Sequence, residues 1–136
     1  MQKTGSCLCG AVKFEIDDVP DQVGACHCSM CRKWSGGVFM AITAAEDKLR
    51  FTAGEPAIYA SSDWAERGFC ARCGSSLFYR LKGPAPEYHV GIGTLEDASG
   101  ITLTTEIFTD EKPGGYAFAG ATQKMTGAEL FAKYGA

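Results

Sequence analysis

The sequence predicts an all-β protein of antiparallel sheets with one short helix near the C-terminal end. Short apolar or alternating segments recur along the chain, separated by turns rich in Gly, Pro and Asp. Glycine supplies 17 of the 136 residues, against a usual share of roughly 7%. Because this composition favours turns and short strands over long helices, and the length suits one core, we expect a single domain over residues 1–136.

The N-terminal half contains the clearest alternating strand. Residues 10–16 (GAVKFEI) alternate apolar and charged side chains, which indicates a half-buried strand. A polar turn with a Pro follows at residues 17–21, and residues 34–37 (WSGG) form a loop by composition. We expect further short strands over the β-prone ranges 38–43, 49–52 and 57–60.

The C-terminal half continues the same pattern and then changes period. Residues 66–69 lead into a cysteine pair, and strands are expected over the ranges 75–81, 88–92 and 103–108. Thr126 and Glu129 then fit a capping box, with Leu130, Phe131 and Tyr134 following at helical spacing. The capping box and the helical spacing of these apolar residues therefore predict one short C-terminal helix.

Charge and hydropathy exclude several function classes. The chain has 13 basic and 16 acidic residues and a formal net charge of −3, so it offers no electrostatic footprint for nucleic acid or anionic lipid. No run of 18 apolar residues occurs, and residues 1–5 (MQKTG) lead into no apolar signal region. We therefore expect a cytoplasmic protein with no nucleic-acid or membrane partner.

The seven cysteines fall into three groups of two, three and two. The groups are residues 7–9 (CLC), 26–31 (CHCSMC) and 70–73 (CARC). In a reducing compartment such clustering indicates metal ligands rather than disulfides, and an odd count cannot form a full disulfide framework.

The two pairs predict a closed, structural zinc site. Cys7 and Cys9 are two residues apart, so on an extended backbone both thiols face one way. Cys70 and Cys73 have knuckle spacing, followed by Gly74, which tolerates a left-handed turn. Together they supply four sulfur ligands, the number that a structural zinc takes.

Cys26, Cys28 and Cys31 supply three ligands to a second zinc, the number found at catalytic sites with one open position. Alternatively, a fourth protein ligand closes this site. His27 is the candidate, although between two ligating cysteines its side chain should point away. His89 is better explained as an ordinary strand histidine. A third alternative is a redox-active thiol at Cys28.

An open position on a three-thiolate zinc suits an incoming thiol. Zinc with soft sulfur ligands binds further sulfur well, and a coordinated thiol is deprotonated at neutral pH. Such a thiolate, held beside an aldehyde, adds to its carbonyl carbon, and the reverse reaction breaks the carbon–sulfur bond. The sequence therefore favours carbon–sulfur lyase chemistry, with Cys28 as the catalytic ligand.

Several segments resemble the glutathione-dependent formaldehyde-activating enzyme family, which includes the centromere protein V type. They are GSCLCGAV (5–12), CHCSMCRK (26–33) and RGFCARCGSSL (67–77), with weaker echoes in GTLED (93–97), EIF (106–108) and KP (112–113). The resemblance implies a β-tent fold, a structural zinc on Cys7, Cys9, Cys70 and Cys73, and a second zinc on Cys26, Cys28 and Cys31. It also implies condensation of formaldehyde with glutathione.

The chain departs from the family pattern at two places. Many members carry His where Glu106 stands here, and Trp where Gly115 and Tyr116 stand. The cysteine framework is untouched, so these departures bear on the substrate-facing end.

Basic residues follow the second cluster directly. Arg32 and Lys33 could hold the carboxylates of glutathione, since Arg presents a planar fork of donors. The alternative, for these residues and for Arg67, is solvated surface charge. The main functional hypothesis is a zinc-dependent carbon–sulfur lyase acting on a glutathione-like thiol and an aldehyde, and its rival is a non-catalytic two-zinc interaction module.

Overall fold

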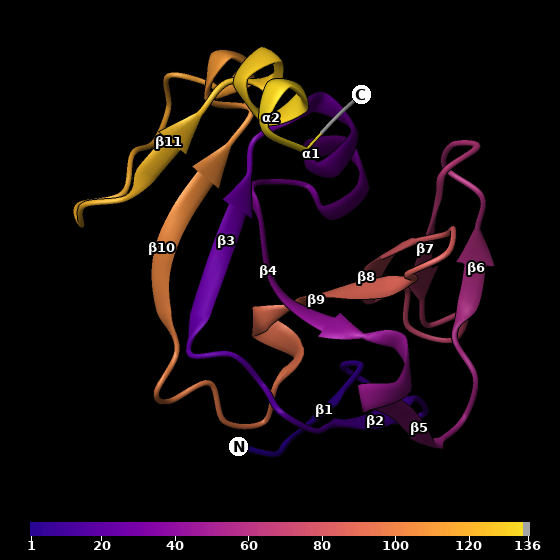
Figure 1. Ribbon diagram of the computed structural model, residues 1–136. Helices are drawn as coiled ribbons and strands as arrows, with labels where there is room; N and C mark the ends of the chain where they lie inside the picture. The colour runs from indigo at the N-terminus through magenta and orange to yellow at the C-terminus, as the bar shows by residue number, and fades with distance from the viewer. Residues whose placement is uncertain (135–136) are drawn as a thin grey trace.

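The computed structural model describes residues 1–134, and these residues form two β-sheets joined by turns and short helices (Figure 1). The smaller sheet has three strands in the order β1-β2-β5, and both pairings are antiparallel. Its strands are β1 (Lys3–Ser6), β2 (Lys13–Ile16) and β5 (Leu49–Ala53).

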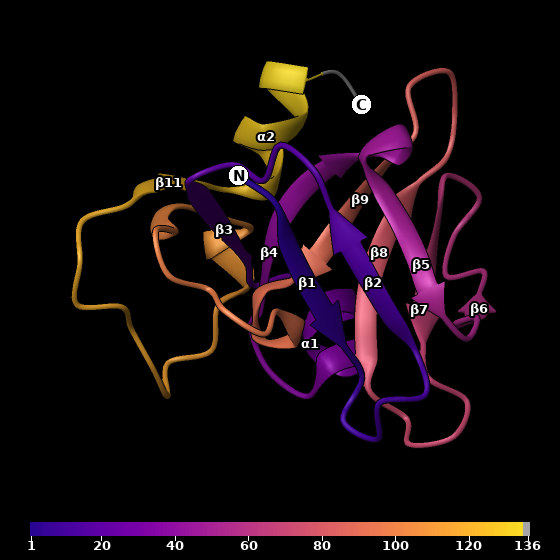
Figure 2. The same ribbon diagram turned by 90° about the horizontal axis from the view of Figure 1, so that it is seen from below.

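The larger sheet has eight strands in the order β11-β10-β3-β4-β9-β8-β7-β6. It contains β3 (Gln22–Cys26), β4 (Phe39–Ala45), β6 (Ala57–Tyr59), β7 (Ala65–Phe69), β8 (Ser76–Leu81), β9 (Glu87–Gly91), β10 (Thr102–Ile107) and β11 (Gln123–Met125). Figure 2 shows the smaller sheet lying in front of strands β8 and β9 of the larger one.

Helices are short throughout the described residues. They are α1 (Ser29–Ser35), α2 (Gly127–Tyr134) and the 3₁₀ turns η1 (Glu46–Lys48), η2 (Ile92–Thr94) and η3 (Thr109–Glu111). Both α-helices lie at the end of the molecule away from the smaller sheet (Figure 1). Within residues 1–134 no helix has the length and apolar character needed to cross a membrane.

The predicted fold class is confirmed, including the short C-terminal helix. Helix α2 starts with the expected capping box: the Glu129 N–H donates to Thr126 Oγ1 at 3.1 Å, and the Thr126 N–H donates to Glu129 Oε1 at 2.9 Å. These two bonds satisfy donors that the first turn of a helix leaves unpaired.

Three features differ from the sequence predictions. Residues 34 and 35, predicted as loop, belong to helix α1, which ends at Gly36 in the left-handed region (φ 81°). A helix this short has little stability alone, so its contacts with the rest of the protein decide whether it forms. Strands β1 and β3 were not predicted, because their residues show no clear periodicity. Strand β10, finally, pairs in parallel with β3 and β11, although mostly antiparallel pairing was expected.

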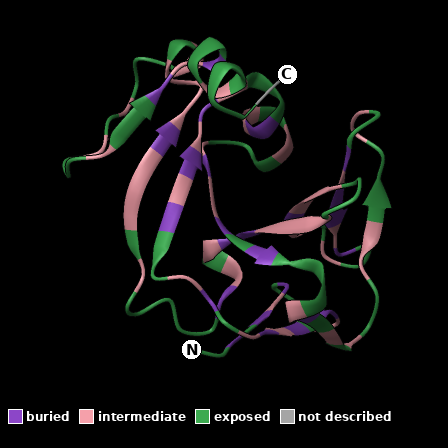
Figure 3. Cartoon of the chain, viewed as in Figure 1, coloured by how far each residue is buried: buried purple, intermediate pink, exposed green. Residues whose placement is uncertain are grey.

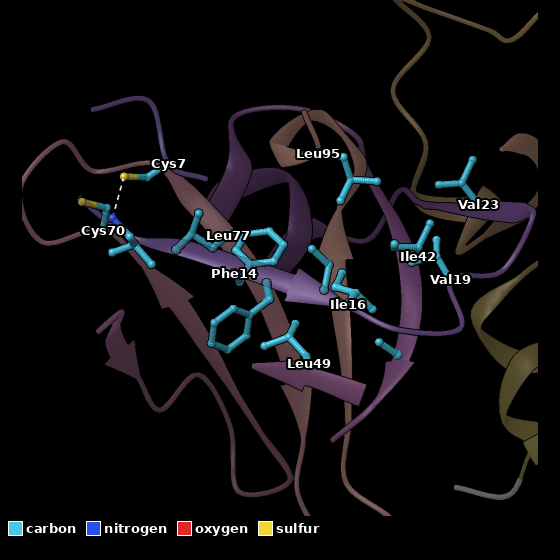
Figure 4. Packing of buried hydrophobic residues seen from close by; sticks show 14 residues of the cluster. Cys7, Phe14, Ile16, Val19, Val23, Ile42, Leu49, Cys70, Leu77 and Leu95 are labelled. Carbon is cyan, nitrogen blue, oxygen red and sulfur yellow. Dashed lines mark hydrogen bonds between the residues drawn. The ribbon is translucent and has the colours of Figure 1, made fainter. Parts of the chain in front are cut away.

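The core lies between the two sheets. Phe14 and Ile16 of β2 are buried together with Ile42, Leu77 and Val90 of the larger sheet. Burying such a side chain stabilises the fold by ~1.5–3 kcal/mol. Figure 3 shows buried residues in the strands of both sheets, and in Figure 4 Cys7 and Cys70 lie side by side at one end of this cluster. The core therefore extends to the first set of cysteines.

Candidate metal centres

Four cysteines from two distant turns converge beside the core. Cys7 and Cys9 lie in the turn between β1 and β2, whereas Cys70 and Cys73 lie in the turn between β7 and β8. Their Sγ atoms all lie within 4.8 Å of one another. The Sγ of Cys9 is 3.6 Å from that of Cys7 and 3.8 Å from that of Cys70. We call this set the four-cysteine cluster.

Each half of the four-cysteine cluster is a tight turn closed by a glycine. The Gly10 N–H donates to the Cys7 carbonyl at 3.2 Å, and the Gly74 N–H donates to the Cys70 carbonyl at 2.8 Å. Both glycines have φ 79°, a left-handed conformation that other residues rarely adopt. The prediction of an extended backbone at Cys7 and Cys9 was wrong, because this turn delays the following strand until Lys13.

Hydrogen bonds orient the sulfur atoms of this cluster. The Val12 N–H donates to Cys7 Sγ at 3.3 Å and the Cys73 N–H donates to Cys70 Sγ at 3.4 Å. Ser75 joins the two turns, since its Oγ accepts from the Leu8 N–H at 3.0 Å and lies 3.2 Å from Cys73 Sγ. The hydrogen bonds from Ser75 lower the pKa of the Cys73 thiol to about 5. Cys73 is thus favoured as a thiolate, the form that binds metals.

Three further cysteines converge where strand β3 passes into helix α1. Cys26 ends β3, Cys28 is the N-cap of α1, and Cys31 lies in its first turn. Their Sγ atoms also lie within 4.8 Å of one another, and among residues 1–134 no His, Asp or Glu joins them. We call this set the three-cysteine cluster. The grouping into four and three that the sequence predicts is therefore present in the structure.

The start of α1 shapes the three-cysteine cluster. Cys28 Sγ accepts from the Cys31 N–H at 3.4 Å, in the way that an N-cap side chain satisfies the first turn of a helix. Hydrogen bonds from Cys26 and Cys31, and from the backbone of the first turn, lower the pKa of the Cys28 thiol. Cys31 is buried, while Cys26 and Cys28 are half-buried. The cluster is thus accessible mainly at Cys26 and Cys28.

Arg67 lies against this cluster rather than on the surface. Its side chain is 3% exposed, and both terminal nitrogens lie 3.7 Å from Cys31 Sγ. Its Cζ lies 4.9 Å from the ring centroid of Tyr79 and 5.9 Å from that of Trp34. Neither sequence interpretation of Arg67, as surface charge or as a carboxylate anchor, describes this contact.

His27 points away from the three-cysteine cluster, as its position between two cysteines predicts. It is fully buried, with Nε2 2.8 Å from Glu106 Oε1 and Nδ1 2.6 Å from the Tyr116 hydroxyl. The His27 N–H also donates to the Ile107 carbonyl at 3.1 Å. The side chain and backbone of His27 therefore bind the segment of the three-cysteine cluster to strand β10 and to the residues that follow this strand.

Glu106 is the centre of a buried polar network. It is 2% exposed, and its Oε2 accepts from the Thr122 hydroxyl and lies 3.7 Å from Lys124 Nζ. Burial alone would raise the pKa of this carboxyl, but the hydrogen bonds from Thr122 and His27 and the charge of Lys124 together lower it. Glu106 is therefore held as a carboxylate.

The remaining predicted site residues lie near the cluster without touching its sulfur atoms in any recorded contact. Arg32 donates from Nε to the His27 carbonyl at 3.0 Å, which fixes its stem against the metal-ligand segment. Lys33 is exposed on α1. His89 lies elsewhere, with Nε2 3.0 Å from Glu87 Oε1 on the same strand, as expected of an ordinary strand histidine.

A family model for the glutathione-dependent formaldehyde-activating enzyme matches residues 2–111. This chain belongs to that family. A Schizosaccharomyces pombe protein, named as an uncharacterized lyase, is 30% identical over 126 residues, which is 93% of this chain and 92% of the relative. A Halomonas elongata protein with the family description in its name is 37% identical over 83 residues, which is 54% of this chain and 53% of the relative.

The fold is also similar to that of a solved relative. A crystal structure of a Rhodobacter sphaeroides protein is 29% identical in sequence and superposes with a TM-score of 0.58. The match covers 74% of this chain and 99% of that protein. This chain thus matches the glutathione-dependent formaldehyde-activating enzyme family in sequence and the Rhodobacter sphaeroides protein in fold, and its two cysteine clusters could hold metal ions.

Sequence reasoning missed two partners of the three-cysteine cluster. Arg67 reaches Cys31 across 36 positions, and Glu106 reaches His27 across 79. The signal for Arg67 was weak, since a charged residue in a short strand that leads into a cysteine pair has many explanations. Glu106 stood out only as a departure from the family pattern.

The Glu106 network predicts a pH-dependent stability difference. Glu106→Gln should lower the unfolding free energy by ~1.5–3 kcal/mol at pH 7, the usual value of hydrogen bonds to a charged group. Because the folded pKa lies below the unfolded one, this contribution is fully present above the unfolded pKa of ~4.3 and is lost as the pH falls through the folded pKa. Urea denaturation of both proteins from pH 7 down to about pH 2 measures this difference, because the loss begins only below ~4.3. A difference that stayed constant over this range would contradict the assigned charge.

Proposed function

We propose that this protein is a zinc-dependent carbon–sulfur lyase that forms or breaks the bond between a glutathione-like thiol and a small aldehyde such as formaldehyde. The observation that carries the proposal is the inequality of the two clusters, four cysteines in one and three in the other. Membership of the glutathione-dependent formaldehyde-activating enzyme family supports the same chemistry.

The sulfur spacing of the four-cysteine cluster supports zinc. A tetrahedral zinc with Zn–S bonds of ~2.3 Å requires sulfur atoms ~3.8 Å apart. The recorded Sγ···Sγ distances of 3.6 and 3.8 Å in the four-cysteine cluster agree with this value. All seven donors are thiols, which zinc prefers over the oxygen ligands that calcium and magnesium take. The residues therefore fit two zinc ions, one in each cluster.

We assign a structural role to Cys7, Cys9, Cys70 and Cys73. Four sulfur ligands complete a tetrahedral shell, which leaves no place for substrate. The turns that they join are separated by 61 residues and close one end of the core. Such binding contributes on the order of 10–16 kcal/mol of folding free energy in zinc-finger peptides, which is comparable with the whole stability of a typical domain.

We assign the reaction to the three-cysteine cluster. Zinc held by Cys26, Cys28 and Cys31 would supply one further coordination position, at which a thiol binds as its thiolate. Cys26 and Cys28 are half-buried, so a small thiol can approach them, whereas Cys31 and Arg67 lie behind.

The reaction needs no oxidant or reductant. In the condensing direction the sulfur lone pair forms a bond to the carbonyl carbon, the π electrons of the carbonyl move to its oxygen, and that oxygen takes up a proton. The product is a hemithioacetal that contains all atoms of thiol and aldehyde. In the lyase direction the hydroxyl loses its proton, the carbonyl reforms and the carbon–sulfur bond breaks.

We propose that Arg32 and Lys33 hold the carboxylates of a glutathione-like thiol. They follow the cluster on helix α1, and Arg32 is fixed by its bond to the His27 carbonyl. Arg forms bidentate pairs with carboxylates, and Lys acts as a point charge. In this role they orient the thiol while its sulfur lies at the three-cysteine cluster.

The two clusters should respond differently to loss of one ligand. We expect Cys73→Ser to unfold the protein, because three ligands no longer complete the structural site. Cys28→Ser should remain folded and retain one zinc per chain instead of two. Circular dichroism and metal analysis of the purified proteins measure both outcomes. If the two variants behaved alike, the division into structural and reactive clusters would be wrong.

The activity itself is tested with formaldehyde and glutathione. We expect the wild-type protein to accelerate formation and breakdown of S-hydroxymethylglutathione, and Cys28→Ser to lose this acceleration by at least about two orders of magnitude, as for removal of a catalytic group. Exchange measurements by nuclear magnetic resonance report both rates against the uncatalysed reaction. A wild-type rate equal to that in buffer, with a fourth ligand seen by metal spectroscopy, would instead support a non-catalytic two-zinc module.

The anchoring role of Lys33 predicts a change in substrate binding. Lys33→Ala should raise KM for glutathione up to about fivefold with kcat unchanged, as loss of one exposed ion pair is worth ~1 kcal/mol. The matched control is Lys82→Ala, which removes an exposed lysine on the loop after β8. An equal effect of both changes would assign the Lys33 effect to overall charge rather than to a contact with the thiol.

A further inference from the structure

Arg67 carries a positive charge into the interior of the larger sheet. It lies on β7, in register with Tyr59 of β6 and Tyr79 of β8, and its side chain is 3% exposed. The rings of Tyr79 and Trp34 lie beside its guanidinium. Removing such a charge from water is costly unless an opposite charge and hydrogen-bond acceptors replace the water.

The group that offsets this charge is the sulfur of Cys31. Both terminal nitrogens of Arg67 donate toward Cys31 Sγ at 3.7 Å. Within residues 1–134, no carboxylate forms an ion pair with Arg67. The buried guanidinium is thus directed at Cys31, which is buried, whereas the other two cysteines of the three-cysteine cluster are half-buried.

The net charge of the three-cysteine cluster indicates how the contact between Arg67 and Cys31 affects thiol binding. A divalent ion held by the three thiolates would carry a net charge of −1, and a bound substrate thiolate would make it −2. A guanidinium in contact with one of the sulfur atoms offsets one of these charges, in surroundings where charges interact more strongly than in water. The contact therefore favours the thiolate-bound state over the state without substrate.

The hydrogen bonds also distinguish the three cysteines. Cys31 faces two N–H groups of Arg67 and is buried, whereas Cys28 accepts from one backbone N–H and is half-buried. Donors directed at a sulfur ligand lower its electron density and tune the metal that it binds. Cys31 should therefore be the least nucleophilic of the three toward an aldehyde.

We propose that Arg67 is a positioning residue of the three-cysteine cluster, which favours entry of a substrate thiolate and keeps Cys31 from reacting with the aldehyde. The first part of this inference rests on the proposed lyase function. The second part concerns Cys31 alone and stands without it.

The first test measures thiol binding without turnover. The probe is 2-mercaptoethanol, which has no carboxylate, added to cobalt-loaded protein while the sulfur-to-cobalt charge-transfer band is recorded. We expect Arg67→Met to weaken thiol binding by at least about tenfold, because the positive charge is lost. Arg67→Lys should weaken it by less, because lysine keeps the charge but lacks the planar fork of N–H donors. The matched control, Arg72→Met, removes an exposed arginine beside Cys73 and should bind like wild type.

The second test measures the reactivity of Cys31 directly. Zinc-loaded proteins are treated with iodoacetamide, and alkylation is followed cysteine by cysteine with peptide mass spectrometry. We expect Arg67→Met to raise the rate at Cys31 by at least about tenfold with the rate at Cys28 unchanged, since the shielding donors are lost. Arg67→Lys should raise it by less, and this variant serves if the methionine variant fails to fold.

The outcomes separate the two parts of the proposal. If wild-type protein bound no 2-mercaptoethanol, the lyase function and the first part would both fail, while the alkylation test would still decide the second. If wild type bound the thiol and both Arg67 variants bound it equally well, the first part alone would be overturned. Unchanged alkylation of Cys31 in both variants would overturn the second part.

Discussion

The structure depends on the convergence of two turns that are far apart in the sequence. The turn after β1 and the turn after β7 bring four sulfur atoms within 4.8 Å of one another. The same contact holds the smaller sheet against the larger one at one end of the core (Figure 4). Ser75 ties the turns together even without a metal, since it contacts both Leu8 and Cys73. Four cysteine sulfur atoms gathered this closely could hold a metal ion, which would bind them as thiolates.

This arrangement determines what β7 presents to the second cluster. Strand β7 enters the four-cysteine cluster at Cys70, and three residues earlier the same strand contributes Arg67. Its fixed register beside β8 stacks the guanidinium on Tyr79. Helix α1 is joined to β8 by a bond from Ser76 Oγ to the Trp34 carbonyl at 3.3 Å. The four-cysteine cluster and the three-cysteine cluster are thus connected through one short strand.

The opposite side of the three-cysteine cluster depends on a parallel strand. Because β10 runs parallel to β3, Glu106 lies opposite Ala25 and Ile107 opposite Cys26, one step before His27. The buried carboxylate and the Ile107 carbonyl can then both bind His27. This network holds the crossing from β3 into α1, where the cysteines lie, and leaves His27 outside the metal-ligand set. The cluster is therefore positioned by a strand that contributes no ligand.

The sequence by itself determined the fold class, the family and the grouping of the cysteines, because each is encoded in local spacing: alternation within strands, the capping box at Thr126, and thiols separated by one or two residues. Only the tertiary structure decided that residues 29–35 form a helix, that Arg67 lies against Cys31, and that Glu106 binds His27. These features depend on sheet order and register, which bring together residues 36 and 79 positions apart, and local periodicity carries no information about such pairings.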